Sequence, residues 1–189
     1  MSSLGLTAHD FVDAESKVRE RPQDHALELR VWLRLLTCAN LIEAEIRKRL
    51  RERFDTTLPR FDLMAQLERS PDGLLLGDLS RRMMVSNGNV TGLVDRLAAE
   101  GLIERRVVKT DRRAARVVLT KAGRAQFQLM ATAHGDWIGE LVGGLDSSEQ
   151  DLLWRRLGDL KASVRTAVAA ANLKSAAAPS GQTPGEETT

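Results

Sequence analysis

The chain has 189 residues, of which 42% are hydrophobic, and its formal net charge is only +2. That size suits a soluble globular protein with one core, or with one core and a smaller lobe. The sequence has no apolar run of about 18 residues and no basic-then-apolar N-terminus, which argues against a transmembrane helix and a secretory signal and predicts a cytoplasmic protein with no membrane partner.

The first predicted element is a long helix. Residues 1–23 have weak periodicity and are expected to form a short N-terminal arm, whereas apolar residues recur at helical spacing from Asp24 to Phe54. The apolar stripe is broad, which indicates burial on two sides, by the chain itself and by a second subunit. We therefore expect a homodimer in which residues 24–56 belong to a helical dimerisation region.

Three shorter helices are predicted next, at 57–69, 76–82 and 87–100. Thr57 and Ser86 are the expected N-caps of the first and third, because a hydroxyl oxygen can accept a hydrogen bond from a free N–H of the first turn. Pro59 fits the first turn of its helix, and Gly101 stands where glycine commonly ends one.

A β-hairpin with a basic loop follows these helices. Two β-branched runs, 103–108 and 116–119, flank the loop 109–113. Thr120 is the expected cap of a helix over 121–143, and Asp146 or Ser147 that of a last helix to about Ala171. Residues 57–120 then form one lobe, 121–171 complete the dimerisation region, and the polar segment 172–189 is predicted to be a disordered tail without an assigned role.

Positive charge is concentrated in one part of the sequence. Between Arg81 and Arg124 there are eleven basic and four acidic residues, which leaves a net charge of −5 for the rest of the chain. A merely solvated surface would mix the signs, so this distribution predicts a polyanion-binding segment, with double-stranded DNA as the leading partner.

Short hydrogen-bonding side chains crowd the start of the helix at 87–100: Ser86, Asn87, Asn89 and Thr91. Such side chains suit base edges and phosphates where a helix N-terminus enters the major groove. The opposite face, which would pack on the scaffold, carries Val90, Leu93, Val94 and Leu97. Arg112 and Arg113 in the hairpin loop could reach the adjacent minor groove. Capping alone explains serine and asparagine at a helix start, and loop arginines are usually solvated. The order of these parts and their charge together favour a winged helix.

Two segments, LSRRMMVSNGNVTGLVDRLAAEGLIER and DRRAARVVLTKAG, resemble the MarR family of winged-helix bacterial transcription regulators. The second matches the family's wing signature: Asp, any residue, Arg, then a strand ending in Leu-Thr and a nearby Gly. The resemblance covers about residues 24–168. It implies a mainly α fold with a small β-wing, and a homodimer on a palindromic operator with half-sites about 34 Å apart. It also implies a repressor that responds to a ligand.

The resemblance also implies residue roles. The side chains expected to face the major groove are Ser86, Asn87, Asn89, Val90 and Thr91. Arg113, beside Arg112, would be the wing arginine, and Asp95 and Asp111 correspond to acids that hold wing arginines, so an Asp95–Arg113 pair is a hypothesis. Arg96 is either a phosphate contact or a partner in a structural ion pair.

The family resemblance also implies an effector that binds between the dimerisation helices and the winged lobe. TTLPRFDLMAQL and LSRRMMVSNGNVTG look most like the subset of the family that controls catabolism of aromatic acids, which implies an aromatic acid or an aromatic acyl-CoA. The candidate pocket residues are Trp32, Arg60, Phe61, Met64, His134 and Trp137. Their aromatic rings could stack on a ligand while Arg60 pairs with its anion. The alternative for most of them is a place in the core, since they occur at core spacing.

Other functions fit the sequence less well. There is no G-x-S-x-G, H-E-x-x-H or phosphate-loop motif, and the three histidines are far apart, so neither an enzyme, a metal nor a cofactor is expected. Cys38, the single cysteine, is predicted to be a buried small hydrophobe. Peroxide sensing is disfavoured because family thiol sensors use tyrosine and this chain has none. The alternative function is a winged-helix module that binds protein instead of DNA, against which the concentrated charge argues.

Overall fold

The computed structural model describes residues 26–108 and 111–177, and within them every side chain except those of residues 107, 108, 111–114 and 175–177. The chain divides into two compact units, Met1–Leu141 and Val142–Thr189. As predicted, the fold is mainly α-helical with one small antiparallel sheet. None of the helices in the described part combines the length and apolarity needed to span a lipid bilayer.

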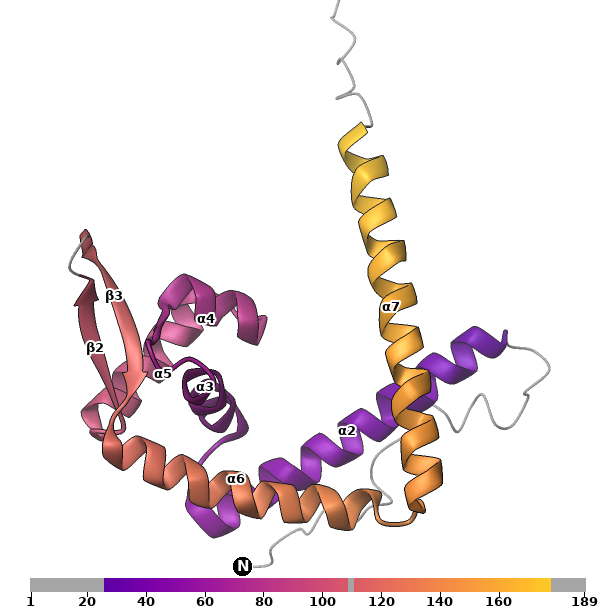
Figure 1. Cartoon of the computed structure of the whole chain (residues 1–189), viewed down its shortest axis with the longest axis horizontal. Coiled ribbons are helices and arrows are strands. Elements are labelled where there is room, and N and C mark those ends of the chain that lie inside the picture. Colours follow the sequence, from indigo (N-terminus) through magenta and orange to yellow (C-terminus); the bar gives the residue numbers. More distant parts are fainter. Residues whose placement is uncertain (1–25, 109–110, 178–189) are drawn as a thin grey trace, which may run out of the picture. The chain divides into compact units, whose positions relative to one another are not determined.

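The first unit holds five described helices and three strands. The helices are α2 (Leu27–Phe54), α3 (Leu58–Glu68), α4 (Leu76–Met83), α5 (Asn87–Ala99) and α6 (Lys121–Val142). The strands are β1 (Leu74–Leu75), β2 (Ile103–Val108) and β3 (Asp111–Leu119), in the sheet order β1-β3-β2. Figure 1 shows β2 and β3 as a long hairpin that extends beyond helices α3, α4 and α5.

The hairpin differs from its predicted form in two ways. β3 begins at Asp111 instead of Arg116, so most of the expected loop belongs to a strand, with a register irregularity between Val107 and Val108. Pairing with β2 supplies the hydrogen bonds that keep this arginine-rich segment extended, although its composition gives little sign of a strand. β1 was not expected at all, and it exists because Leu74 pairs with Val117 of β3.

The core of the first unit joins the winged lobe to helices α2 and α6. Val90, Val94 and Leu97 of α5 are fully buried, together with Leu50 of α2 and Met130 of α6. Burial of such a side chain stabilises the fold by about 1.5–3 kcal/mol. The two helices predicted for dimerisation therefore also form part of the lobe's own core.

Only the C-terminal part of α2 is covered by this core. Ile46 and Leu50 are buried, whereas Leu29, Val31 and Trp32 in the first half of the helix are exposed. Cys38 is exposed as well, so its predicted burial is wrong. The apolar stripe is as broad as expected, but the described chain covers only its last turns.

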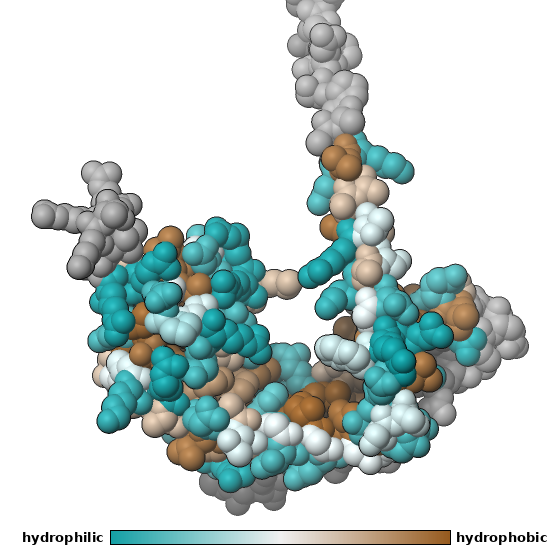
Figure 2. Space-filling model, in the orientation of Figure 1, coloured by the Kyte–Doolittle hydropathy of each residue, from teal (hydrophilic) through white to brown (hydrophobic). Residues whose placement is uncertain are grey.

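The second unit consists mainly of α7 (Ser147–Ala177). Its N-terminus has the expected cap, since the N–H groups of Ser148 and Glu149 donate to Asp146 Oδ1 at 2.8 and 2.9 Å. The helix continues past Ala171, so residues 172–177 are helical and not part of a disordered tail, consistent with their alanine content. Residues 178–189 lie outside the described part. Apolar side chains are exposed along the helix, as the brown patches on α7 in Figure 2 show.

Candidate nucleic-acid interface

A tightly bonded turn sets the direction of α5 relative to α4. The N–H of Met84 donates to Arg81 O at 3.4 Å and that of Val85 to Ser80 O at 3.2 Å, a pattern that closes a helix C-terminus. Ser80 Oγ donates to Val85 O at 2.6 Å. These bonds satisfy backbone groups at the end of α4 and fix the start of the next helix.

The first turn of α5 presents the predicted polar side chains to solvent. Ser86 is the N-cap, and its Oγ accepts the N–H of Asn89 at 3.4 Å. Asn87 and Asn89 are exposed, and a Cβ added at Gly88 would meet nothing within 4 Å. Thr91 is half-buried and its hydroxyl donates to Asn87 O at 2.9 Å. The two asparagine side chains are thus exposed hydrogen-bonding groups at the start of the helix.

Val90 does not belong to this exposed face. Its side chain is 0% exposed and lies in the core with Val94 and Leu97. The expectation that it faces a groove is therefore wrong. The spacing of four and then three residues to Val94 and Leu97 places all three on the inner face of the helix, and the same spacing had already indicated a packing role.

An ion pair joins the hairpin to α5. Arg105 on β2 and Asp95 on α5 approach to 2.6 Å, and Arg106 pairs with Glu104 at 2.6 Å. Arg105 was missed from the sequence because nothing in the spacing indicates which strand residue stands over the helix. The side chains of Asp111, Arg112 and Arg113 lie outside the described residues, so an Asp95–Arg113 pair stays a prediction.

Some other arginines of the lobe bond to nearby groups of the chain, and others extend into solvent. Arg116 donates to Gly73 O at 2.9 Å and so joins β3 to the turn before β1, and Arg81 pairs with Asp78. Arg82 is exposed and reaches Ser70 Oγ at 3.2 Å. Arg96 is exposed, and none of the described side chains forms an ion pair with it, which favours the phosphate-contact alternative over the structural one.

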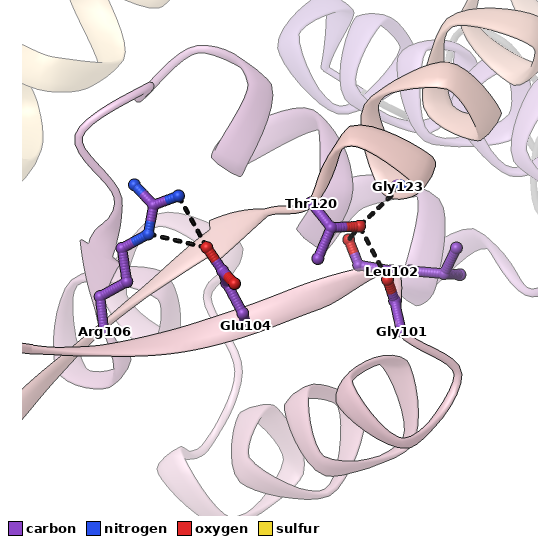
Figure 3. Close-up of polar contacts among 6 residues, drawn as sticks. All are labelled: Gly101, Leu102, Glu104, Arg106, Thr120 and Gly123. Atoms are coloured by element: carbon purple, nitrogen blue, oxygen red, sulfur yellow. Dashed lines mark hydrogen bonds and ion pairs between the residues drawn. The ribbon is translucent and has the colours of Figure 1, made fainter.

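The end of the sheet joins the lobe to α6 through a close backbone contact, shown in Figure 3. Thr120 Oγ1 accepts the N–H of Gly123 at 3.0 Å and donates to Gly101 O at 2.7 Å. A Cβ added at Gly123 would lie 1.8 Å from Leu102 O. The glycine of the wing signature thus has a physical reason: α6 passes so close to Leu102 that no side chain fits.

Comparisons with known proteins agree with this geometry. The MarR family model matches residues 54–114. The activatory protein BadR of Rhodopseudomonas palustris is 32% identical over 125 residues, which span 64% of this chain and 71% of BadR. A MarR family regulator from Silicibacter pomeroyi has a similar structure, with a TM-score of 0.61, 33% identity and coverage of 77% of this chain and 98% of that one.

The chain belongs to the MarR family of transcriptional regulators. Family membership identifies a regulator of transcription and not an enzyme. Streptococcus pneumoniae FabT, solved in complex with DNA, shares the fold with a TM-score of 0.63 at 24% identity, over 74% of this chain and 98% of FabT.

The six residues expected to line an effector pocket in this MarR-family chain are not all brought together. Phe61 of α3 stacks with His134 of α6 at 4.9 Å between ring centroids and with Phe127 at 5.5 Å. Arg60 pairs with Glu100, and its buried Nε has no hydrogen-bond partner among the residues that the structure describes. Phe61, Asp62 and His134 form an α3–α6 cluster, since the charge of Asp62 acts on the imidazole of His134.

Of the other three candidates, two belong to the same buried core as Phe61. Met64 and Trp137 are buried in the core, and Trp137 packs against Phe54 with ring centroids 6.1 Å apart. Trp32 is 55% exposed and is not part of the core. The core interpretation of Phe61, Met64 and Trp137 is therefore the better one.

The carboxyl group of Asp62 and the imidazole of His134 both have shifted pKa values. Burial lowers the pKa of His134, and the nearby Asp62 opposes that shift. Burial also raises the pKa of Asp62. The nearby Glu43 raises it as well, whereas His134 and Arg47 lower it. Asp62 was not singled out from the sequence, because its nearness to His134 depends on how α3 packs against α6.

Proposed function

We propose that the chain binds double-stranded DNA sequence-specifically, with α5 in the major groove and the β2–β3 hairpin at the neighbouring minor groove. One observation carries the proposal: Asn87 and Asn89 are exposed at the start of a helix whose opposite face is fully buried. An asparagine amide can donate to and accept from one adenine edge, which makes it a base-reading group. We expect such a regulator in the cytoplasm, where bacterial DNA lies.

The other residues supply position and affinity. Ser86 and Thr91 lie beside the two asparagines, Arg96 is free to contact a phosphate, and Arg112 and Arg113 are proposed for the minor groove, with Asp111 as support. The fold likeness to FabT, whose structure contains DNA, supports this placement. A protein-binding winged helix is the alternative, but it would not need eleven basic residues between 81 and 124.

We further propose a homodimer that reads a palindromic operator. Apolar side chains are exposed on both α2 and α7, including Trp32, Leu157 and Val164. Burial of such surfaces between two copies would remove them from water and place two lobes about a two-fold axis. Half-sites about 34 Å apart would then match one turn of DNA.

Gel-shift titrations with a duplex selected from random sequence by the wild-type chain test DNA binding. We expect Asn89→Ala to weaken binding about tenfold, and Arg96→Ala to lower the salt slope by about one, as loss of a phosphate contact should. Arg51→Ala removes an exposed arginine from α2 and serves as the charge control. If the wild-type chain enriches no sequence at low salt, the protein-binding alternative gains the support instead.

We propose an aromatic acid or an aromatic acyl-CoA as effector, with Arg60 as the anion partner and the Phe61–His134 stack as the ring platform. The buried, unpartnered Nε of Arg60 supports a ligand there. Calorimetric titration with benzoate, a hydroxycinnamate and their CoA thioesters tests this, with Arg60→Gln expected to weaken binding about tenfold. Ligands that bind equally well to the variant would argue for another site.

The direction of regulation is tested by transcription in vitro from a promoter that contains the selected duplex. A fall in transcript on addition of the protein supports the repressor expected from the family resemblance. A rise would give the chain the same sign as BadR, which is named an activatory protein. Addition of an effector that releases the DNA should reverse either change.

A further inference from the structure

Met84 combines two properties that are each unfavourable for a methionine. Its backbone is left-handed, with φ 55° and ψ 36°, and its side chain is 94% exposed. Among the large hydrophobic side chains of the described part, it is the most exposed. Neither local packing nor backbone preference accounts for a methionine at this position.

The left-handed conformation is imposed by the bonded turn after α4. Glycine is the usual residue at this place in such a turn, because it has no Cβ to clash with the backbone. The other described non-glycine residue with a positive φ is Asp55, and aspartate tolerates this region better than methionine. Met84 therefore has a strained backbone, and it lacks the short polar side chain that lets Asp55 tolerate the left-handed region.

The neighbours of Met84 show that its exposure belongs to this position and not to the whole turn. Met83 and Val85 pack against the core on either side of it. Ser86 and Asn87, which follow directly, are exposed. Two hydrogen bonds between Ser80 and Val85, and one from the N–H of Met84 to Arg81 O, hold the turn. The Met84 side chain therefore projects from a fixed base next to the polar start of α5.

We propose that Met84 is a DNA-contact residue that packs against apolar groups of the duplex, either the thymine 5-methyl group or the deoxyribose. The inference rests on the proposed DNA binding and adds an apolar contact to it. A thioether chain is flexible and polarisable and can fit such groups, and contact with a thymine methyl discriminates between bases. The contact would remove an exposed apolar side chain from water and so favour the complex.

The experiment compares the full-length wild-type chain with Met84→Ala and Met84→Gly on the selected duplex and on a non-specific duplex. We expect both variants to bind the selected duplex about three- to tenfold more weakly, with the same salt slope because no charge is lost. Binding to the non-specific duplex should stay unchanged if Met84 touches a thymine methyl, and should weaken as well if it touches deoxyribose. Met84→Gly should also melt at the same or a higher temperature, since it relieves the left-handed strain. Leu129→Ala, which truncates an exposed leucine on α6, is the matched control.

A second copy of the duplex, with uracil in place of thymine, separates the two sources of the contact. If Met84 touches a thymine methyl, the loss caused by Met84→Ala should shrink on the uracil duplex; if it touches deoxyribose, the loss should be equal on both. If Met84→Ala binds the selected duplex with the affinity of the wild-type chain, this inference is wrong but the proposed DNA binding stands. A changed sedimentation coefficient without DNA would assign Met84 to a subunit contact and also overturn it. A wild-type chain that selects no duplex would overturn the proposed function together with this inference.

Discussion

Helices α5 and α7 are both amphipathic, but their apolar faces meet different surroundings. In α5, Val90, Val94 and Leu97 are each 0% exposed, and the polar side chains lie on the other face. In α7, the apolar residues recur at the same helical spacing, yet Leu157, Leu160 and their neighbours are exposed. The first helix finds its partners within its own chain.

One chain buries the apolar face of α5 in its own core, whereas it leaves the apolar face of α7 exposed to solvent. A recognition surface needs a rigid base, and the winged lobe has one, because its core draws on α2 and α6 of the same chain. An exposed stripe of leucine and valine on a helix as long as α7 is typical of a surface that a partner covers. The two regions should therefore respond differently to mutation.

The largest expected effect is the dissociation of the proposed dimer on substitution of Leu160 by Glu. A carboxylate buried between two copies of α7 would lack a partner, and we expect the dissociation constant to rise about a thousandfold, or about 4 kcal/mol. Sedimentation equilibrium measures this change. Circular dichroism should show that the winged lobe stays folded.

Thr166→Glu is the control for added charge on the same helix, because Thr166 lies away from the stripe that contains Leu153, Leu157 and Leu160. It should leave the association unchanged. Equal association of the Leu160→Glu and wild-type chains would show that α7 does not supply the subunit contact, and the comparison with α5 would need another explanation.

The second effect lies within the first unit. Gly123→Ala would place a Cβ 1.8 Å from Leu102 O, a backbone atom that cannot move away alone, and we expect a loss of about 3 kcal/mol in the free energy of unfolding. Urea unfolding measures it. Gly135→Ala on the same helix, where a Cβ would meet nothing within 4 Å, should instead stabilise the fold by about 0.5–1 kcal/mol. Similar losses in both variants would assign the effect to α6 as a whole.

The features that the sequence predicts correctly are those that depend on residues close together in the chain. The periodicity of the helices, the caps at Ser86 and Asp146 and the position of the hairpin all follow from residues close together in the chain, and the structure confirms them. The end of α7 was set too early, because the alanines after Leu173 continue a helix as readily as they begin a polar tail.

The errors concern relations between distant residues. β1 has only two residues and no pattern of its own, so its existence depends on Val117 as a partner. The ion pair between Asp95 and Arg105 depends on how β2 crosses α5, and the exposure of Cys38 on how much of α2 the core covers. The sequence suggests both a groove-facing and a core-facing role for Val90, and its complete burial shows that it faces the core.

A smaller effect is expected from the ion pair between α5 and the hairpin. Both side chains of the Asp95–Arg105 pair are largely solvent-exposed, so a double-mutant cycle with Asp95→Asn and Arg105→Gln should give a coupling of about 0.5 kcal/mol. The Asp151–Arg155 pair on α7 is the matched reference, since it lies within one helix and should give a similar value. Zero coupling at Asp95 would leave that carboxylate available for the predicted pairing with Arg113.

The smallest effect is a pH dependence confined to the first unit. Burial lowers the pKa of His134 below its ordinary value of 6.5, so the unfolded chain binds more protons than the folded chain as the pH falls through that value. The free energy of unfolding should therefore decrease from pH 7.5 to pH 5.5, and His134→Gln should remove the decrease. The raised pKa of Asp62 acts oppositely and at lower pH, since the folded chain then holds the extra proton.

Asp62→Asn distinguishes the imidazole from other titrating groups. The carboxylate of Asp62 favours the charged imidazole, so its removal should lower the pKa of His134 further and make the loss of stability at low pH larger, not smaller. Urea unfolding of both variants at the two pH values measures the change. The sequence of α7 contains no histidine, so dimer dissociation should not follow the same curve. If it did, the titrating group would have to lie where the subunits meet, and the winged lobe would be less self-contained than its buried core indicates.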